Sequence, residues 1–279
     1  MNSVYASLIY IFLSSFLLYI AKVMFNKFSF FNIEDRIKQK DFTSIIVFCG
    51  YILGITFVLI GAFVGPSAKL LRYDLLMYFA YGVLGIFLMN LSGVIADKVM
   101  LSKFSNAKEI LEDKNMGTAA VHCAFYITTG LIVAACVNGE FGGFVSSVIY
   151  YILGMIFLFI FLKIYDLLTP YSIHAELEKD NYAVGIALAG NIIAIGLILA
   201  KATLGDVSDI HRNIILYFVD LASIVLLLPG IRYLLGNIIF RNINQELKNN
   251  NVAAGLIEFS GIICFAFIIF FMVDFSSVI

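Results

Sequence analysis

The chain has 279 residues, of which 62% are hydrophobic and only 13% are charged, and its formal net charge at pH 7 is −1. A soluble domain usually carries about 25% charged residues, so the composition predicts a membrane protein whose main partner is the lipid bilayer. A net charge this close to zero gives no electrostatic basis for binding nucleic acid, and we expect no nucleic-acid partner.

Apolar segments of about 20 residues, the length that crosses a ~30 Å hydrocarbon core, follow one another along the whole chain. They are continuously apolar, without the alternation of apolar and polar residues that barrel strands show, which indicates helices. The predicted spans lie near residues 4–22, 43–64, 74–97, 116–138, 144–166, 182–203, 213–238 and 252–273. The sequence therefore predicts an all-α polytopic membrane protein with eight transmembrane helices.

The distribution of positive charge predicts the orientation of these spans. The first span has no basic leader, and Lys22 and Lys27 come at its end or after it, which favours a retained anchor over a cleaved signal peptide. The loops that follow odd-numbered spans contain more Lys and Arg than the loops that follow even-numbered spans. By the positive-inside rule, the odd loops are cytoplasmic and both termini lie outside.

One polar phrase of eleven residues occurs four times, once in each predicted cytoplasmic loop. The copies are NIEDRIKQKDF from Asn32, NAKEILEDKNM from Asn106, SIHAELEKDNY from Ser172 and NINQELKNNNV from Asn242, and they start 74, 66 and 70 residues apart. Each copy lies between two spans, so the chain contains four helical hairpins related as parallel repeats. Two hairpins make each half, residues 1–140 and 141–279. The hairpins either surround a central axis or stack as two pairs.

The phrase has the pattern of a short amphipathic helix at the cytoplasmic surface of the membrane. Its first residue is an Asn or Ser suited to a helix N-cap, and an acid or Gln three residues later completes a capping box in three copies. Its second and sixth residues are apolar. Its tenth residue is predicted to cap the transmembrane helix that follows, and the four candidates are Asp41, Asn115, Asn181 and Asn251. The phrase is a corner of the chain, and a gate or docking surface is the compatible functional alternative.

Ionisable residues inside the spans are the candidate functional residues. Glu258 and His122 each lie seven residues after a predicted cap, at about 10 Å depth from the cytoplasmic side. Arg232 reaches a similar depth in the seventh span, so we expect it to pair with Glu258. Asp220, on the outer side of that span, needs another partner or a wet cavity. The Glu258–Arg232 pair either holds two helices together or couples to transport, and His122 is either a packing residue or a proton switch.

Other motifs indicate packing and not chemistry. Gly50, Gly54, Gly61 and Gly65 share one face of the second span, as close helix contacts require. The sequence contains no phosphate-binding loop, zinc-protease motif or nucleophile elbow. We therefore expect no catalytic residues, no metal, no cofactor and no enzymatic activity.

The stretches DNYAVGIALAG (180–190), NNVAAGLIEFSG (250–261) and YDLLTPYSIHAEL (165–177) resemble the YjfL-like family of bacterial inner-membrane proteins, a domain of unknown function with four spans. The second half carries the closer resemblance. The first half resembles a divergent copy, in which Asp41 replaces the Asn and His122 stands where Glu258 stands. The resemblance implies two tandem copies in a bacterial cytoplasmic membrane, and it brings no established activity.

Two functions are compatible with these observations. The first is a conduit or transporter-like bundle for small solutes or ions, supported by the repeat and by the ionisable residues in the spans. The second is a membrane scaffold or accessory subunit whose four corners dock a cytoplasmic protein partner. Either function is compatible with a homo-oligomer.

Overall fold

The computed structural model describes residues 3–65, 70–99, 106–138, 143–204 and 242–272, with short stretches between 215 and 240. Within them, seven helices are long and apolar enough to cross a membrane. They are α1 (Ser3–Phe28), α3 (Phe42–Val64), α4 (Leu71–Val99), α6 (Met116–Val137), α7 (Phe144–Leu168), α9 (Tyr182–Thr203) and α12 (Val252–Met272). The all-α prediction is thus confirmed for the described residues. Most of the predicted span 213–238 lies outside them.

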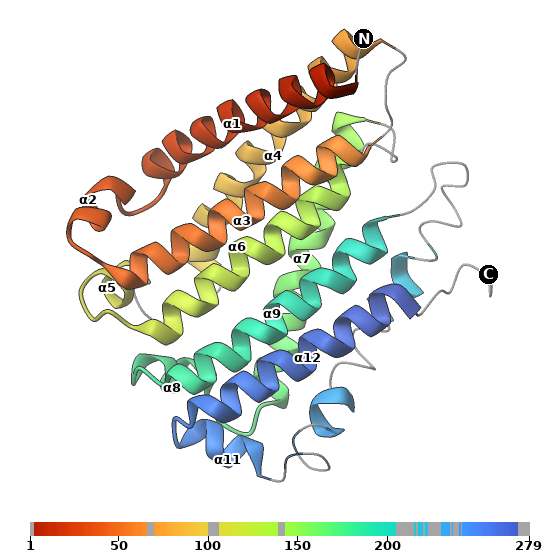
Figure 1. The fold of residues 1–279 in the computed structure, drawn as a ribbon. Coiled ribbons are helices and arrows are strands. Elements are labelled where there is room, and N and C mark those ends of the chain that lie inside the picture. The colour runs from red at the N-terminus through yellow and green to blue at the C-terminus, as the bar shows by residue number, and fades with distance from the viewer. Residues whose placement is uncertain are drawn as a thin grey trace.

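Each of the four polar phrases contains a short helix that leads directly into a long one. These are α2 (Ile33–Lys38), α5 (Asn106–Leu111), α8 (Ile173–Glu178) and α11 (Ile243–Lys248), and they precede α3, α6, α9 and α12. All four lie at one end of the bundle, opposite the start of α1 and the end of α12 (Figure 1). The corners predicted from the repeat are therefore gathered along one edge.

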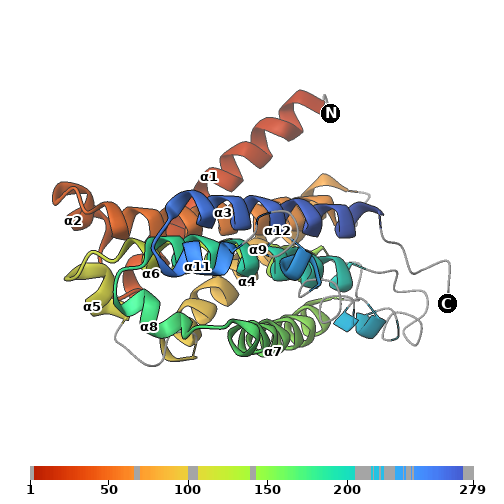
Figure 2. The same ribbon diagram turned by 90° about the horizontal axis from the view of Figure 1, so that it is seen from below.

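The four long helices that follow the corners form a continuous row. Helix α3 packs against α6, α6 against α9, and α9 against α12, and the four lie side by side in Figure 1. Helices α4 and α7 form a second layer on one side of this row (Figure 2), and α1 packs against α3 and α4. The described helices thus form neither a ring around an axis nor two separate pairs.

Glycines bring α3 and α6 into close contact. A Cβ added at Gly50 would lie 2.5 Å from the carbonyl oxygen of Cys123, and the Cβ atoms of Gly54, Gly61 and Gly65 would also collide with the backbone of α6. These glycines are the ones that share a face in the sequence, so the predicted close helix contact is confirmed. Because the missing side chains let the two backbones approach, packing is tight without a hydrophobic driving force.

Each corner reverses the chain by one repeated local geometry. The residue before each cap has a left-handed φ, between 55° and 58° at Lys40, Lys114, Asp180 and Asn250. The cap itself is extended at Asp41, Asn115 and Asn181. The Asn115 and Asn181 side chains accept from the backbone N–H of Thr118 and Val184, at 2.8 and 3.1 Å. Asn251 accepts likewise from Ala253, at 3.1 Å.

The first corner differs, because Asp41 stands at the cap position of α3 but its side chain makes no capping bond to the backbone, contrary to the prediction. Hydroxyl groups of Thr43 and Ser44 donate to the Asp41 carboxylate, and the Lys114 ammonium donates to it at 2.8 Å. Burial alone would raise the pKa of Asp41, but these hydrogen bonds outweigh it, so the pKa lies below its usual value. Asp41 is therefore an anion at neutral pH and forms an ion pair with the second corner.

The structure corrects the gapless alignment of the four phrases. The cap amides of Asn181 and Asn251 donate to Glu176 and Glu246, five residues earlier, whereas Asn115 donates to Glu109, six residues earlier. The second phrase therefore contains one extra residue. As a result Ile110, the fifth residue of this phrase, is fully buried, whereas Leu111, its apolar sixth residue, is only partly buried.

Two further predictions about the phrases are wrong in detail. Glu109, the acid of the predicted capping box in the second phrase, reaches forward to the next cap, where a capping box would require it to reach back. Asn242 has a left-handed φ of 67° and makes no capping bond, whereas Asn32 and Ser172 cap α2 and α8 as predicted. The first helix also runs beyond the predicted end at residue 22, and Lys22 forms an ion pair with Glu34 of α2.

Hydrogen bonds between corners join the row at the edge where the corners lie. The side-chain amide of Asn115 donates to the Leu177 carbonyl at 2.5 Å, and that of Asn181 donates to the Leu247 carbonyl at 2.9 Å. The Thr43 hydroxyl makes the corresponding bond to the Ile110 carbonyl at 2.8 Å. In each of the three junctions, a side chain at the start of one long helix thus bonds a backbone carbonyl in the short helix of the next unit.

We expect Asn181→Ala to destabilise the protein by about 1–2 kcal/mol more than Asn251→Ala. Both changes remove a helix cap, which costs about 1 kcal/mol. Only Asn181 also bonds the neighbouring unit, and its loss leaves the buried Leu247 carbonyl with one acceptor site unfilled. Thermal unfolding of the detergent-solubilised variants measures the difference. Equal losses in the two variants would show that the bond between corners does not contribute to stability.

Candidate intramembrane polar site

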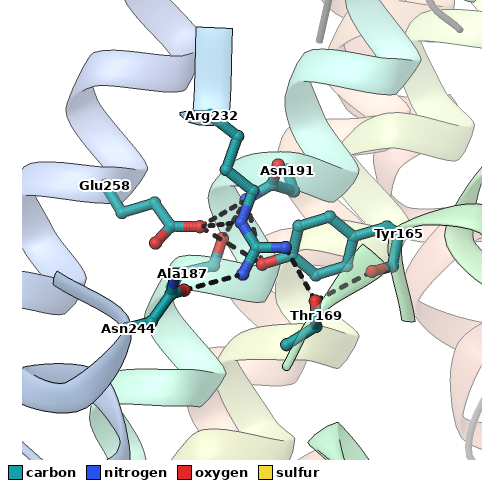
Figure 3. Close-up of polar contacts among 7 residues, drawn as sticks. All are labelled: Tyr165, Thr169, Ala187, Asn191, Arg232, Asn244 and Glu258. Atoms are coloured by element: carbon teal, nitrogen blue, oxygen red, sulfur yellow. Dashed lines mark hydrogen bonds and ion pairs between the residues drawn. The ribbon is translucent and has the colours of Figure 1, made fainter. Parts of the chain in front are cut away.

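The carboxylate of Glu258 is the centre of a buried polar cluster. Glu258 is 1% exposed on α12, seven residues after Asn251. Its Oε1 accepts hydrogen bonds from Arg232 Nε at 3.2 Å, from the Tyr165 hydroxyl at 3.2 Å and from Asn191 Nδ2 at 3.3 Å (Figure 3). One carboxylate oxygen therefore accepts three donors from three different parts of the chain.

The Arg232 guanidinium uses each of its nitrogens within this cluster. Nη1 donates to Thr169 Oγ1 at 2.7 Å and Nη2 donates to Asn244 Oδ1 at 3.4 Å. Its Cζ also lies 4.3 Å from the centre of the Tyr165 ring, which is a cation–π contact. The planar guanidinium is therefore fixed on several sides, a geometry that a lysine ammonium cannot reproduce.

Three elements of the second half supply the remaining side chains. Tyr165 lies on the last turn of α7, and Thr169 caps that helix. Asn191 lies on α9 and Asn244 on α11. Thr169 and Asn191 also bond carbonyls one helical turn earlier, at 2.8 and 2.9 Å. These internal bonds fix the two side chains before they contact the ion pair.

The second oxygen of Glu258 is different from the first. Oε2 is buried and has no hydrogen-bond partner among the described residues. A buried acceptor without a partner costs about 1–3 kcal/mol, and more when it is charged. The cluster therefore neutralises the glutamate through Arg232 but leaves one strong acceptor free to take a proton, a cation or a donor group.

The structure brings together two of the four candidate residues. Glu258 and Arg232 form the expected ion pair. His122 is buried on α6, which is separated from α12 by α9 in the row, and its Nε2 has no partner among the described residues. Asp220 lies outside the described residues. Within the part of the chain that the structure describes, no three His, Cys, Asp or Glu side chains converge as a metal site requires.

Four members of the cluster were not predicted from the sequence as site residues. They are Tyr165, Thr169, Asn191 and Asn244. A weak signal was present, because Tyr165 and Thr169 are four residues apart and so share a helix face. Nothing local in the sequence shows that this face meets α12.

Comparison with known proteins gives the family of the chain. It matches the family described as Domain of Unknown Function (DUF350) twice, over residues 1–137 and over residues 140–273. The chain belongs to the DUF350 family. It contains two copies of the domain, and every member of the Glu258 cluster falls within the second match.

Two relatives of this DUF350 protein are named as transmembrane proteins. A UPF0719 transmembrane protein of Aquifex aeolicus (strain VF5) is 26% identical over 275 residues, which cover 92% of this chain and 98% of the relative. The UPF0719 transmembrane protein YshE of Bacillus subtilis (strain 168) is 28% identical over 112 residues, 39% of this chain and 79% of the relative. No solved structure matches the chain. With its apolar helices, these similarities make it a multi-pass membrane protein.

The first DUF350 copy has aromatic rings where the second has the polar cluster. The phrases at Asn32 and Ser172 are 140 residues apart, so Phe25 corresponds to Tyr165 and Tyr51 to Asn191. The Phe25 and Tyr51 rings pack with centroids 4.7 Å apart, and the Tyr51 hydroxyl donates to a backbone carbonyl in α1. The ion-pair cluster is therefore not reproduced at the corresponding place in the first copy.

Proposed function

We propose that this DUF350 protein is a conduit or transporter-like bundle for ions or small solutes in the bacterial inner membrane. In this proposal the chain crosses the membrane eight times as four hairpins, with the corners α2, α5, α8 and α11 in the cytoplasm and both termini outside. The Glu258 cluster is the polar site that a permeating proton, cation or small solute meets on its path. The proposal includes no enzymatic step.

The observation that carries the proposal is the half-satisfied Glu258 carboxylate. Oε1 is held by Arg232, Tyr165 and Asn191, whereas Oε2 has no described partner. An ion pair that served only to join helices is stable when all its lone pairs are bonded. A buried acceptor kept free at the edge of an ion pair is instead suited to bind and release a cation or proton.

We expect Glu258→Gln to slow proton flux about tenfold in proteoliposomes, as a barrier increase of ~1.4 kcal/mol would. The amide cannot take up a proton at this site, and it does not balance the Arg232 charge. Flux is measured with an internal pH dye under a potassium diffusion potential, and the same vesicles are tested with sodium and potassium gradients. The matched control is Glu112→Gln, because Glu112 is exposed beside α5 and lies outside the cluster.

Two results in this flux assay would contradict the conduit. Wild-type vesicles without flux above that of empty liposomes, or equal flux in Glu258→Gln and wild type, would contradict it. Asp220→Asn tests the residue of the original set that the structure does not describe. If it slows flux as well, the pathway continues to the outer half of the seventh span.

A scaffold is the second candidate, and the row of corner helices favours it. Helices α2, α5, α8 and α11 lie along one edge of the bundle (Figure 1), where a soluble protein would meet all four at once. A photo-reactive residue at exposed Lys108 should then form one adduct of defined mass in cells, and the same residue at exposed Phe144 should not. Equal labelling at both positions, or none, would contradict the scaffold.

A further inference from the structure

The three junctions in the row of long helices use the same positions, counted from the cap at each corner. In the first junction, Thr43, Gly50 and Gly54 stand two, nine and thirteen residues after Asp41. Thr43 bonds the Ile110 carbonyl of α5, and the two glycines face α6. In the second, Gly117 and Thr128 stand two and thirteen residues after Asn115 and face α9. In the third, Ala183 and Gly190 stand two and nine residues after Asn181 and face α12. These positions share one helix face.

This face, which we call the leading face, is buried on α3, α6 and α9 but open on α12. The equivalent positions on α12 are Ala253, Ser260 and Cys264, and all three are exposed. They are as small as their counterparts, although contact with lipid alone sets no need for small residues. Helix α12 thus has the face of a junction without a neighbour among the described helices.

The capping residues of the last corner are also exposed, where those of the earlier corners are buried. The caps Asn115 and Asn181 are 1% and 4% exposed, because the following unit covers them, whereas Asn251 is exposed. Their partners Glu109 and Glu176 are each 7% exposed, whereas Glu246 is exposed. The donor and acceptor groups that join earlier units are therefore accessible at the end of the row.

The opposite end of the row has the complementary opening. The leading face of one helix packs against the next helix in the row, at the residues eight and fifteen after that next helix's own cap. On α6 these residues are Cys123 and Gly130. The equivalents on α3 are Cys49 and Thr56, which are small, uncharged and exposed. Ile37 is 59% exposed, whereas its counterparts in the third and fourth phrases, Leu177 and Leu247, are fully buried.

Charge also matches between the two open ends. In the first junction Lys114, the residue before its cap, reaches the preceding unit and pairs with Asp41 at 2.8 Å. Lys40 holds that place in the first phrase and has the same left-handed backbone. If another chain precedes it in the row, Lys40 faces the exposed Glu246, so a cation meets an anion again.

We propose that copies of this protein associate head to tail within the membrane, with the leading face of α12 in one copy packed against α3 of the next. The contact repeats the internal junctions, so Asn251 donates to the Ile37 carbonyl and Ser260 lies against Cys49 of the neighbour. Such a contact joins two different faces, and it builds a ring if the rotation closes and an open row if it does not.

The relatives support a junction between chains. The match to the B. subtilis relative covers 112 residues that make up 79% of its length and 39% of this chain, so the relative has about the length of one copy of the domain. In a one-copy protein, the junction that this chain forms between its two copies, α6 against α9, exists only if separate chains form it. The α12–α3 contact is a junction of this same kind between chains.

Disulfide trapping tests the contact in native membranes. In the first internal junction, the residue thirteen after one cap lies against the residue fifteen after the next cap, as Gly54 lies against Gly130. Thr56→Cys combined with Cys49→Ser therefore places a new thiol opposite native Cys264 of the neighbouring copy. After oxidation we expect a ladder of dimers, trimers and larger products, with peptides that link positions 56 and 264. A ladder follows because each chain carries one thiol on each edge.

Two control chains make the result decisive. Cys49→Ser alone, which retains Cys264, should give no ladder, and Ile152→Cys with Cys49→Ser, on the exposed side of α7, should give none. If the products stop at a dimer linked through two copies of Cys264, two α12 helices face each other in a symmetric contact, and the head-to-tail proposal is wrong. No product from the Thr56→Cys chain would show that lipid alone covers the two edges.

A second measurement does not depend on cysteine chemistry. Ser260→Trp fills the leading face of α12 and should convert the assembly to monomers, counted by stepwise photobleaching of labelled protein in membranes. Ile152→Trp is the matched lipid-facing control and should leave the count at its wild-type value. Monomers in the wild type, or an unchanged assembly in Ser260→Trp, would overturn the proposal.

Discussion

Arg232→Met is expected to destabilise the protein by about 3–5 kcal/mol, because it leaves the Glu258 carboxylate buried without its countercharge. Glu258 is 1% exposed, and Arg232 is the cation that pairs with it. The change also removes the hydrogen bonds to Thr169 and Asn244 and the cation–π contact with Tyr165. Thermal and denaturant unfolding in detergent, followed by circular dichroism, measures the loss.

The double variant Arg232→Met with Glu258→Gln separates the charge from the packing. It removes both charges together, so we expect it to recover most of the stability lost in Arg232→Met alone, since an ion pair replaced as a whole is often neutral. A double variant as unstable as Arg232→Met would show that the guanidinium acts through packing and hydrogen bonds. An unchanged stability in Arg232→Met would contradict the buried ion pair itself.

Gly54→Leu is expected to destabilise the protein by about 3 kcal/mol, at the upper end of the usual cost of overpacking. Gly54 of α3 and Gly130 of α6 lie directly opposite each other, and a Cβ added at Gly130 would collide with the Gly54 backbone. The new side chain therefore meets main chain, which cannot rotate away as a side-chain tip can. The two helices must separate, and the contacts of Gly50 and Gly61 weaken with them.

Gly230→Leu is the matched control, because a Cβ added at Gly230 meets nothing within 4 Å. It should leave the unfolding midpoint close to that of the wild type. Comparison of folded yield and unfolding midpoint in the same detergent checks the pair. A Gly54→Leu protein as stable as Gly230→Leu would mean that α3 and α6 are not in backbone contact.

The Glu258–Arg232 ion pair could be predicted because the depth of a residue in the membrane follows from its distance along the sequence. Glu258 and Arg232 are each placed by counting residues from a corner, and two charges at one depth in consecutive predicted spans have few other partners. Tyr165 and Asn191 could not be predicted in the same way. Their contact with Glu258 depends on α7 and α9 both meeting α12, which no local pattern specifies.

The second phrase shows where a sequence pattern fails. All four copies align without gaps, yet the hydrogen bond from Asn115 reaches six residues back and those from Asn181 and Asn251 reach five. The extra residue is accommodated in the turn between α5 and Asn115, the cap of α6, where backbone geometry has more freedom than in a helix. The repeated sequence thus located each corner, but only the hydrogen bonds of the caps gave the correct alignment of the second phrase with the others.

The sequence by itself determined that this protein is helical and membrane-bound, with repeated Asx-capped corners. Apolar length and helix capping are local properties, and each is complete within about twenty residues. Only the tertiary structure decided that the helices form a row, α3, α6, α9 and α12, with open faces at both ends. The reason is physical: in lipid, helices are chosen as neighbours by the fit of small residues across a pair. Gly54 and Gly130, which make one such fit, lie in different repeats of the chain.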